Sequence, residues 1–210
     1  MTTGQEEDNA LIDRIVAGDA AALRLLIQRE HATLVRFARA ITRDQELAEE
    51  VVQDGWVRIH RGLPQFERRS SLRTWMARIV INRAKTLAAR AARWVPFENE
   101  AEGQEDTIDP GCFSPRGFWA TAPARWHAET PERLLSRQQI RAAIEAELES
   151  LPAGQRAVLT LRDLEGWASE EVCNALDISE SNQRVLLHRA RSRVRAALEK
   201  VIGADVGNSE

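Results

Sequence analysis

Basic side chains at helical spacing are concentrated near the carboxyl end of the chain, between residues 181 and 200. Arg184, His188 and Arg191 follow one another at intervals of four and three residues, which places them on one face of a helix. Guanidinium groups bind phosphate oxygens and can donate two hydrogen bonds to the edge of a guanine base. This face therefore indicates recognition of a nucleic acid.

A second basic segment lies between residues 58 and 93, where Glu67 is the only acidic residue. The following segment, 98–109, reverses the sign with a run of glutamate and aspartate. The net charge of −3 therefore hides two cationic blocks that flank an acidic one. This pattern favours two surfaces for polyanions, joined by a segment that DNA would repel. Each basic block can also be read as an ordinary solvated helix face.

The elements that must position these groups are helices, because the 210-residue chain is rich in Ala, Leu, Arg and Glu and few segments alternate as strands do. Apolar residues at helical spacing predict three helices that share one core. The first follows an N-cap at Asp19, the second follows Asp44 and ends near 62–64, and the third follows Ser70 or Ser71. The acidic amino-terminal stretch, MTTGQEEDNALIDRI, lacks the apolar core of a signal peptide.

A long linker, 95–131, is predicted where the periodicity disappears and prolines and glycines accumulate. Its second half contains aromatic residues, which we expect to dock either on the chain's own helices or on a partner. We therefore predict an all-α protein with two small helical domains, 8–94 and 132–202, joined by this acidic linker. Helices are expected at 132–150, 153–164, 169–176 and 181–201.

The last two helices have the pattern of a helix-turn-helix. A short helix is followed by a tight turn at 177–179 and by the long basic helix. Asp177 stands where such turns need a left-handed residue, which aspartate tolerates. This arrangement presents the basic helix to the DNA major groove, although a helical bundle without DNA binding remains an alternative.

Two stretches resemble one known family. LPAGQRAVLTLRDLEGWASEEVCNALDISESNQRVLLHRARSRVRAAL resembles the −35-binding domain of extracytoplasmic-function (ECF) sigma factors. AEEVVQDGWVRIHRGLPQFERRSSLRTWMARIVINRAKTLAAR resembles their −10-binding domain. The resemblance covers nearly everything except the two tails and the linker. It implies a transcription initiation factor that binds core RNA polymerase and directs it to promoter DNA.

The resemblance also assigns roles to residues. It places core polymerase binding on a set of mostly acidic side chains: Glu49, Glu50, Gln53 and Asp54. It places −10 DNA binding on a loop and the helix after it: Gln65, Phe66, Arg68, Arg69, Ser71, Arg78, Asn82 and Lys85. It places −35 DNA binding on the terminal helix: Arg184, Val185, His188 and Arg189, to which helical spacing adds Arg191. Phe66 could instead belong to the hydrophobic core. Val185 and Leu186 depart from the family pattern, so the resemblance does not say which −35 sequence the helix recognises.

The sequence and the resemblance also indicate which other partners and activities to expect. An anti-sigma factor is an expected partner, and the acidic linker is expected to enter the basic channels of the polymerase. A stand-alone helix-turn-helix regulator is the alternative, but it does not explain the basic three-helix domain. No enzyme motif, cofactor or metal site is expected, nor is membrane insertion. Two cysteines without a CxxC pattern fit the cytoplasm, and a redox role for Cys112 is left open.

Overall fold

The computed structural model describes residues 3–90 and 131–207. Within these ranges the regular structure is helical and no strand occurs, which confirms the all-α prediction. The described residues divide by their contacts into two units. The first consists of residues 3–90 with Thr160–Ser179, and the second of residues 131–159 with 180–207. The expected linker lies mostly outside the described residues, and the expected domain ranges remain a prediction.

The amino-terminal half of the first unit begins with a helix that the sequence analysis did not predict, α1 (Thr3–Val16). Its buried residues are Leu11, Ile12 and Ile15. The next helix, α2 (Ala20–Thr42), begins where predicted, because the carboxylate of Asp19 accepts hydrogen bonds from the backbone N–H groups of Ala21 and Ala22.

Two further helices form from equally local signals. The Asp44 carboxylate caps α3 (Gln45–Gly62) by accepting from the N–H of Leu47 at 3.0 Å. A short 3₁₀ turn, η1 (Leu63–Gln65), follows at the proline. The hydroxyl of Ser71 accepts from the N–H of Thr74 at 3.1 Å and so caps α4 (Leu72–Arg90).

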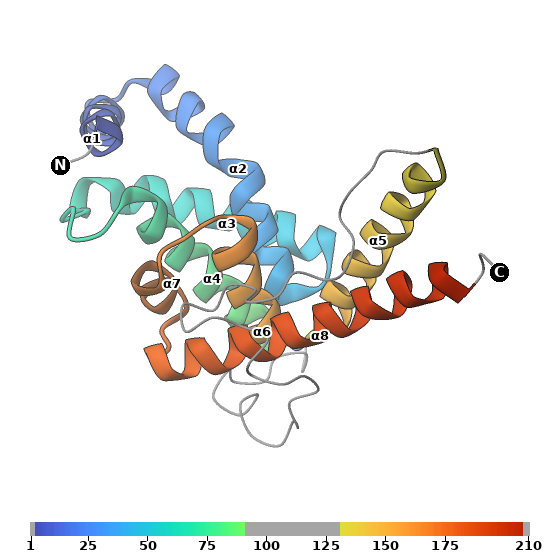
Figure 1. Cartoon of the computed structure of the whole chain (residues 1–210). Helices are drawn as coiled ribbons and strands as arrows, with labels where there is room; N and C mark the ends of the chain where they lie inside the picture. Colours follow the sequence, from blue (N-terminus) through green and yellow to red (C-terminus); the bar gives the residue numbers. More distant parts are fainter. Residues whose placement is uncertain (1–2, 91–130, 208–210) are drawn as a thin grey trace. The chain divides into compact units, whose positions relative to one another are not determined.

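Helices α2, α3 and α4 pack on one another and share the core that the periodicity predicted (Figure 1). Helices α3 and α4 approach each other closely at a glycine. A Cβ atom on Gly55 would lie 2.9 Å from Cγ2 of Val80. The core consists of large apolar side chains with almost no exposure: Leu26, Leu34, Phe37, Ile41, Val51, Val52, Ile59, Met76, Val80 and Ile81.

The first unit is completed by a π-helical turn, η4 (Thr160–Leu164), and by α7 (Ser169–Leu176). Helix α7 packs on α4, and η4 packs on α2. Asp177 ends α7 in the left-handed conformation, with φ 58° and ψ 53°, and its N–H donates to Cys173 O. The turn chemistry predicted for this position is therefore confirmed.

The second unit consists of α5 (Pro131–Ser150), α6 (Ala153–Leu159) and α8 (Glu180–Gly207), with α8 packed along the other two. An ion pair of 2.9 Å joins Arg193 of α8 to Glu147 of α5. No helix among the described residues is long and apolar enough to cross a membrane.

Candidate nucleic-acid and polymerase interfaces

The loop between η1 and α4 presents one aromatic ring in a partly open position. Phe66 is half-buried, and its ring lies 4.9 Å from that of Trp75 with an interplanar angle of 38°. The N–H of Phe66 donates to Leu63 O at 3.1 Å, which fixes the start of the loop. Phe66 is thus neither fully buried in the core nor free of it. A base that stacked here would extend an aromatic pair that already exists.

The two arginines of the loop differ in their partners. Arg68 adopts the left-handed conformation, with φ 58°, and forms an ion pair with Asp13 of α1. Arg69 pairs with its neighbour Glu67 at 2.7 Å, and its side chain is 83 % exposed. An exposed pair of this kind contributes little to stability, so Arg69 can exchange its carboxylate for a phosphate at small cost.

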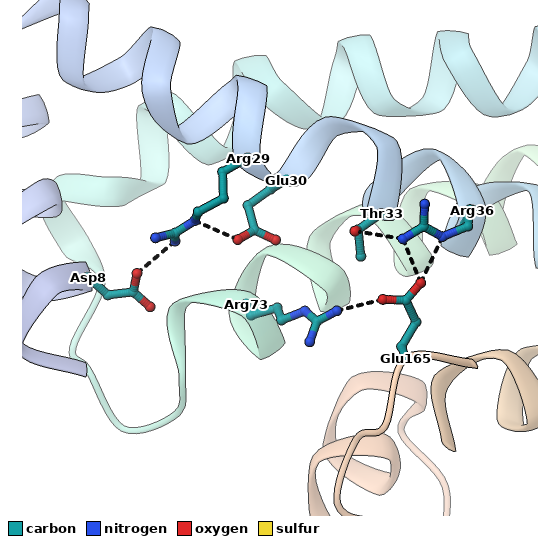
Figure 2. Close-up of polar contacts among 7 residues, drawn as sticks. All are labelled: Asp8, Arg29, Glu30, Thr33, Arg36, Arg73 and Glu165. Atoms are coloured by element: carbon teal, nitrogen blue, oxygen red, sulfur yellow. Dashed lines mark hydrogen bonds and ion pairs between the residues drawn. The ribbon is translucent and has the colours of Figure 1, made fainter. Parts of the chain in front are cut away.

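These residues border an open cleft of about 600 Å³ in the first unit. Its walls come from α1, α2, the loop, the first turn of α4 and α7, with Asp8, Arg29, Phe66, Arg69 and Glu171 among the lining residues. Arg29 donates to Asp8 at 2.7 Å and to Glu30 at 2.8 Å, so this wall carries mixed charge (Figure 2). The cleft combines an aromatic ring and four arginines with open space, although four acidic side chains also line it. Aromatic rings and cations are the groups with which proteins bind a single strand.

Helix α4 carries three further residues of the expected −10 set. Arg78 and Asn82 are exposed and lie one turn apart, and Lys85 follows at half-buried depth. Lys85 Nζ donates to Leu176 O, the backbone carbonyl at the end of α7. Gln65 is exposed and Ser71 serves as the cap of α4. The eight expected −10 residues therefore belong to the end of η1, the loop after it and α4. Partners within the chain already hold Arg68, Arg69, Ser71 and Lys85.

The expected polymerase-binding residues all belong to α3. Glu50 and Gln53 are exposed. Glu49 accepts a hydrogen bond from Gln45 at 3.0 Å and lies 3.3 Å from Nε2 of His31. These side chains form an acidic face at helical spacing, as the sequence predicted.

Asp54 differs from the rest of this face because it also joins α3 to α4. Its carboxylate lies 3.1 Å from Arg58 and 2.6 Å from Nε of Arg83. The second contact is too bent to be a hydrogen bond, so it acts as an ion pair. A substitution of Asp54 thus changes both the acidic face and the packing of the unit.

The expected −35 residues of α8 have very different exposures. Arg184 and Val185 are exposed, and Arg184 pairs with Glu180 one turn earlier at 2.6 Å. His188 and Arg189 are half-buried, and Arg191 is only 7 % exposed. Arg184 is the most accessible cation of the set, whereas Arg191 is not accessible in this conformation.

Sequence reasoning missed the contribution of α1. Its Asp8 lines the cleft, and its Asp13 forms an ion pair with Arg68. A signal for it was present, because Leu11, Ile12 and Ile15 stand at helical spacing before Gly18. It also missed that Arg193 is held by Glu147 and by Ser150 Oγ, and that Arg195, 8 % exposed, pairs with Glu199. Both arginines therefore stabilise the second unit, although their charge suggests phosphate binding.

Comparisons with known proteins match both parts of the chain. Residues 26–94 match the family model of sigma-70 region 2, and residues 141–194 match that of sigma-70 region 4. The RNA polymerase sigma-H factor of Pseudomonas aeruginosa is 29 % identical over 94 % of this chain and 97 % of that protein. The ECF RNA polymerase sigma-E factor of Escherichia coli K12 is 28 % identical with the same coverage.

The fold is also similar to a solved structure. The sigma factor RpoE of Bartonella quintana, crystallised with the anti-sigma factor NepR, superposes with a TM-score of 0.54 at 19 % identity, covering 84 % of this chain and 96 % of that chain. Two family matches stand in the expected order, and the relatives span almost the whole chain. The chain belongs to the ECF sigma factors, the subunits that direct RNA polymerase to promoters.

Proposed function

We propose that this sigma factor captures the −10 single strand at the cleft that the loop 65–71 and the first turn of α4 border. The observation that carries the proposal is that the half-buried ring of Phe66 and the exposed Arg69 line one open cleft, and that Arg78 and Asn82 are exposed one turn apart further along α4. A ring supplies stacking for an unpaired base, arginines hold the backbone phosphates, and an amide can read a base edge. These contacts favour the melted strand because a base within a duplex cannot reach the ring.

Core polymerase is proposed to dock on the acidic face of α3. Glu50 and Gln53 are exposed, and Glu49 is only partly covered, so carboxylates are available to a basic partner. Opposite charge speeds the encounter of two proteins and fixes their register. An anti-sigma factor is proposed as a second protein partner, and the site of action is proposed to be the cytoplasm, where the polymerase works.

The −35 element is proposed to be read by the first turns of α8. Arg184 is 72 % exposed, and its pairing with Glu180 is an i,i+4 surface pair of small energy that DNA can displace. Val185, 39 % exposed, offers an apolar contact of the kind that thymine methyl groups accept. Arg191 could contribute only after a change in its surroundings, because it is nearly buried.

The experiment is transcription reconstituted with core polymerase, combined with permanganate footprinting of the melted promoter. Asn82→Ala and Arg69→Ala should reduce melting more than initial promoter binding. Arg61→Ala is the matched control, since Arg61 is an exposed arginine outside the proposed surface. Arg184→Ala should cost about 1–3 kcal/mol of −35 discrimination if it contacts a base. Melting by both −10 variants at the wild-type level would refute the cleft assignment.

A further inference from the structure

The loop 66–71 between η1 and α4 holds one residue in a conformation that its side chain disfavours. Arg68 has a positive φ of 58°, a left-handed conformation that glycine adopts freely and that costs free energy when a Cβ atom is present. Arg43 and Asp177 share this conformation, but each ends a helix, where its backbone N–H donates to the last turn. Arg68 lies inside the loop, so a helix end does not account for its conformation.

The guanidinium of Arg68 ties the loop to α1. Its Nη2 donates a hydrogen bond to Oδ1 of Asp13, a residue 55 positions earlier in the chain. Helix α1 is itself held in place, because it packs on α2 and η1 and buries three apolar side chains: Leu11, Ile12 and Ile15. The ion pair therefore joins the loop to a helix whose position is set by apolar packing.

Both ends of the loop are fixed as well. At its start the N–H of Phe66 donates to a carbonyl of η1 at 3.1 Å. At its end the hydroxyl of Ser71 accepts the hydrogen bond that caps α4. Arg68 is the left-handed residue between these fixed ends. Its backbone angles therefore set the direction in which the chain leaves Phe66 and reaches Arg69.

The residues on either side of Arg68 are those proposed to receive the strand. The side chains of Phe66 and Arg69 line the same cleft, but they stand on opposite sides of position 68 in the chain. A rotation of the backbone at position 68 moves one of them relative to the other. The affinity for a strand therefore depends on the fraction of molecules in which Arg68 is left-handed, because that shape presents both groups to the cleft together.

We propose that Arg68 is a positioning residue, whose ion pair with Asp13 holds the loop in the shape that accepts the −10 strand. This inference rests on the proposed function, because the strand is the ligand for which the loop is shaped. Arg68 then contributes through the loop, and Arg69, 83 % exposed, is the cation that meets the strand. Solvent reaches both partners of the pair, so its contribution is small, about two- to fivefold in affinity.

The test compares Arg68→Ala with Arg68→Gly in holoenzyme reconstituted with core polymerase. Both changes remove the guanidinium, but alanine keeps the cost of the left-handed conformation, whereas glycine adopts it freely. The DNA is a promoter selected by the wild-type holoenzyme from a random library, labelled and carrying a preformed mismatch bubble at the −10 element. Competition binding followed by fluorescence anisotropy should give an affinity about two- to fivefold lower for Arg68→Ala and unchanged for Arg68→Gly.

A substitution on α1 tests the same contact from its other side. Asp13→Ala leaves the loop sequence intact and should also lower the affinity about two- to fivefold. Glu6→Ala is the matched control, since Glu6 is an exposed acidic residue of the same helix outside the lining of the cleft. In an Arg68→Gly background, Asp13→Ala should have no further effect, because no ion pair is left to break. Hydrogen exchange should be faster in the loop for Arg68→Ala and Asp13→Ala, and unchanged in α3.

Three results would overturn the inference. If Arg68→Gly binds the bubble as weakly as Arg68→Ala does, the guanidinium itself contacts the strand. If Asp13→Ala binds more tightly than wild type, Asp13 competes with the strand for Arg68. If either Arg68→Ala or Asp13→Ala binds as wild type does, the pair does not hold the loop. Promoter melting by Asn82→Ala tests the proposed function separately, so a failure of one is distinguishable from a failure of the other.

Discussion

The contact between Gly55 of α3 and Val80 of α4 makes Gly55→Ala an informative perturbation. An alanine Cβ would lie 2.9 Å from Cγ2 of Val80, closer than carbon atoms pack without repulsion. Val80 is fully buried, and a β-branched side chain has little freedom to turn away. The substitution must therefore move the two helices apart or force Val80 from its rotamer.

The expected cost follows from two opposing effects. Replacing glycine by alanine inside a helix stabilises it by about 1 kcal/mol. Overpacking of a well-packed core costs about 1–3 kcal/mol. Gly55→Ala should therefore lower the free energy of unfolding of the first unit by about 1 kcal/mol, between about 0 and 2. In a Val80→Ala background the clashing methyl is gone, so the same substitution should raise the stability by about 1 kcal/mol.

The assay is a double-mutant cycle on the full chain, with hydrogen exchange of α3 and α4 peptides followed through increasing urea. Val80→Ala alone should cost about 2 kcal/mol for its two lost methyl groups and the space they leave. The coupling between the two positions should then be about 1–3 kcal/mol. A Gly55→Ala variant that is more stable than wild type, or a coupling near zero, would refute this account of the helix contact.

Two further outcomes follow from the acidic face and the α2 cap. Glu50→Lys should abolish co-purification with core polymerase and leave the free energy of unfolding unchanged. Asp54→Lys should also lower the free energy of unfolding by about 1 kcal/mol, because its ion pair with Arg83 is lost. Co-purification of Glu50→Lys with the polymerase would contradict the docking assignment. Hydrogen bonds from Arg14, and then from two backbone N–H groups, lower the pKa of Asp19. Its stabilising contribution is therefore complete above the unfolded pKa of about 3.9 and is lost as the pH falls through the lower folded value. Asp19→Asn should flatten the decline of urea midpoints below about pH 4, and an unchanged decline would contradict this cause.

The helices were predictable because residues close in sequence determine where each of them begins and ends. Asp19, Asp44 and Ser71 each cap a helix through their own side chain, and Asp177 ends α7 in the left-handed conformation. Each of these contacts joins residues within a few positions, so the signal is present in a short stretch of sequence. The loop and helix that carry the proposed −10 residues were placed correctly for the same reason.

The unpredicted features depend on contacts between distant parts of the chain. Arg36 and Glu165 are far apart in sequence, as are Arg193 and Glu147, and no local pattern indicates that either pair meets. Charge alone predicts that an arginine prefers an anion, but it does not distinguish a phosphate from a carboxylate of the same chain. Arg193 illustrates the ambiguity, because its charge would suit a phosphate but it forms an ion pair with Glu147 in the α5–α8 contact.

This ambiguity bears on how strongly the isolated chain can hold DNA. Several cations proposed for promoter contact already have an anionic partner: Arg68 with Asp13, Arg69 with Glu67, and Arg184 with Glu180. Each pair must separate before a phosphate can take the place of the carboxylate. The free energy gained on DNA binding is therefore only the difference between the arginine–phosphate and the arginine–carboxylate ion pair. The free carboxylate also stays near the bound strand and repels it. The number of arginines therefore overstates the affinity, and a firm hold on the promoter requires the additional contacts that core polymerase supplies.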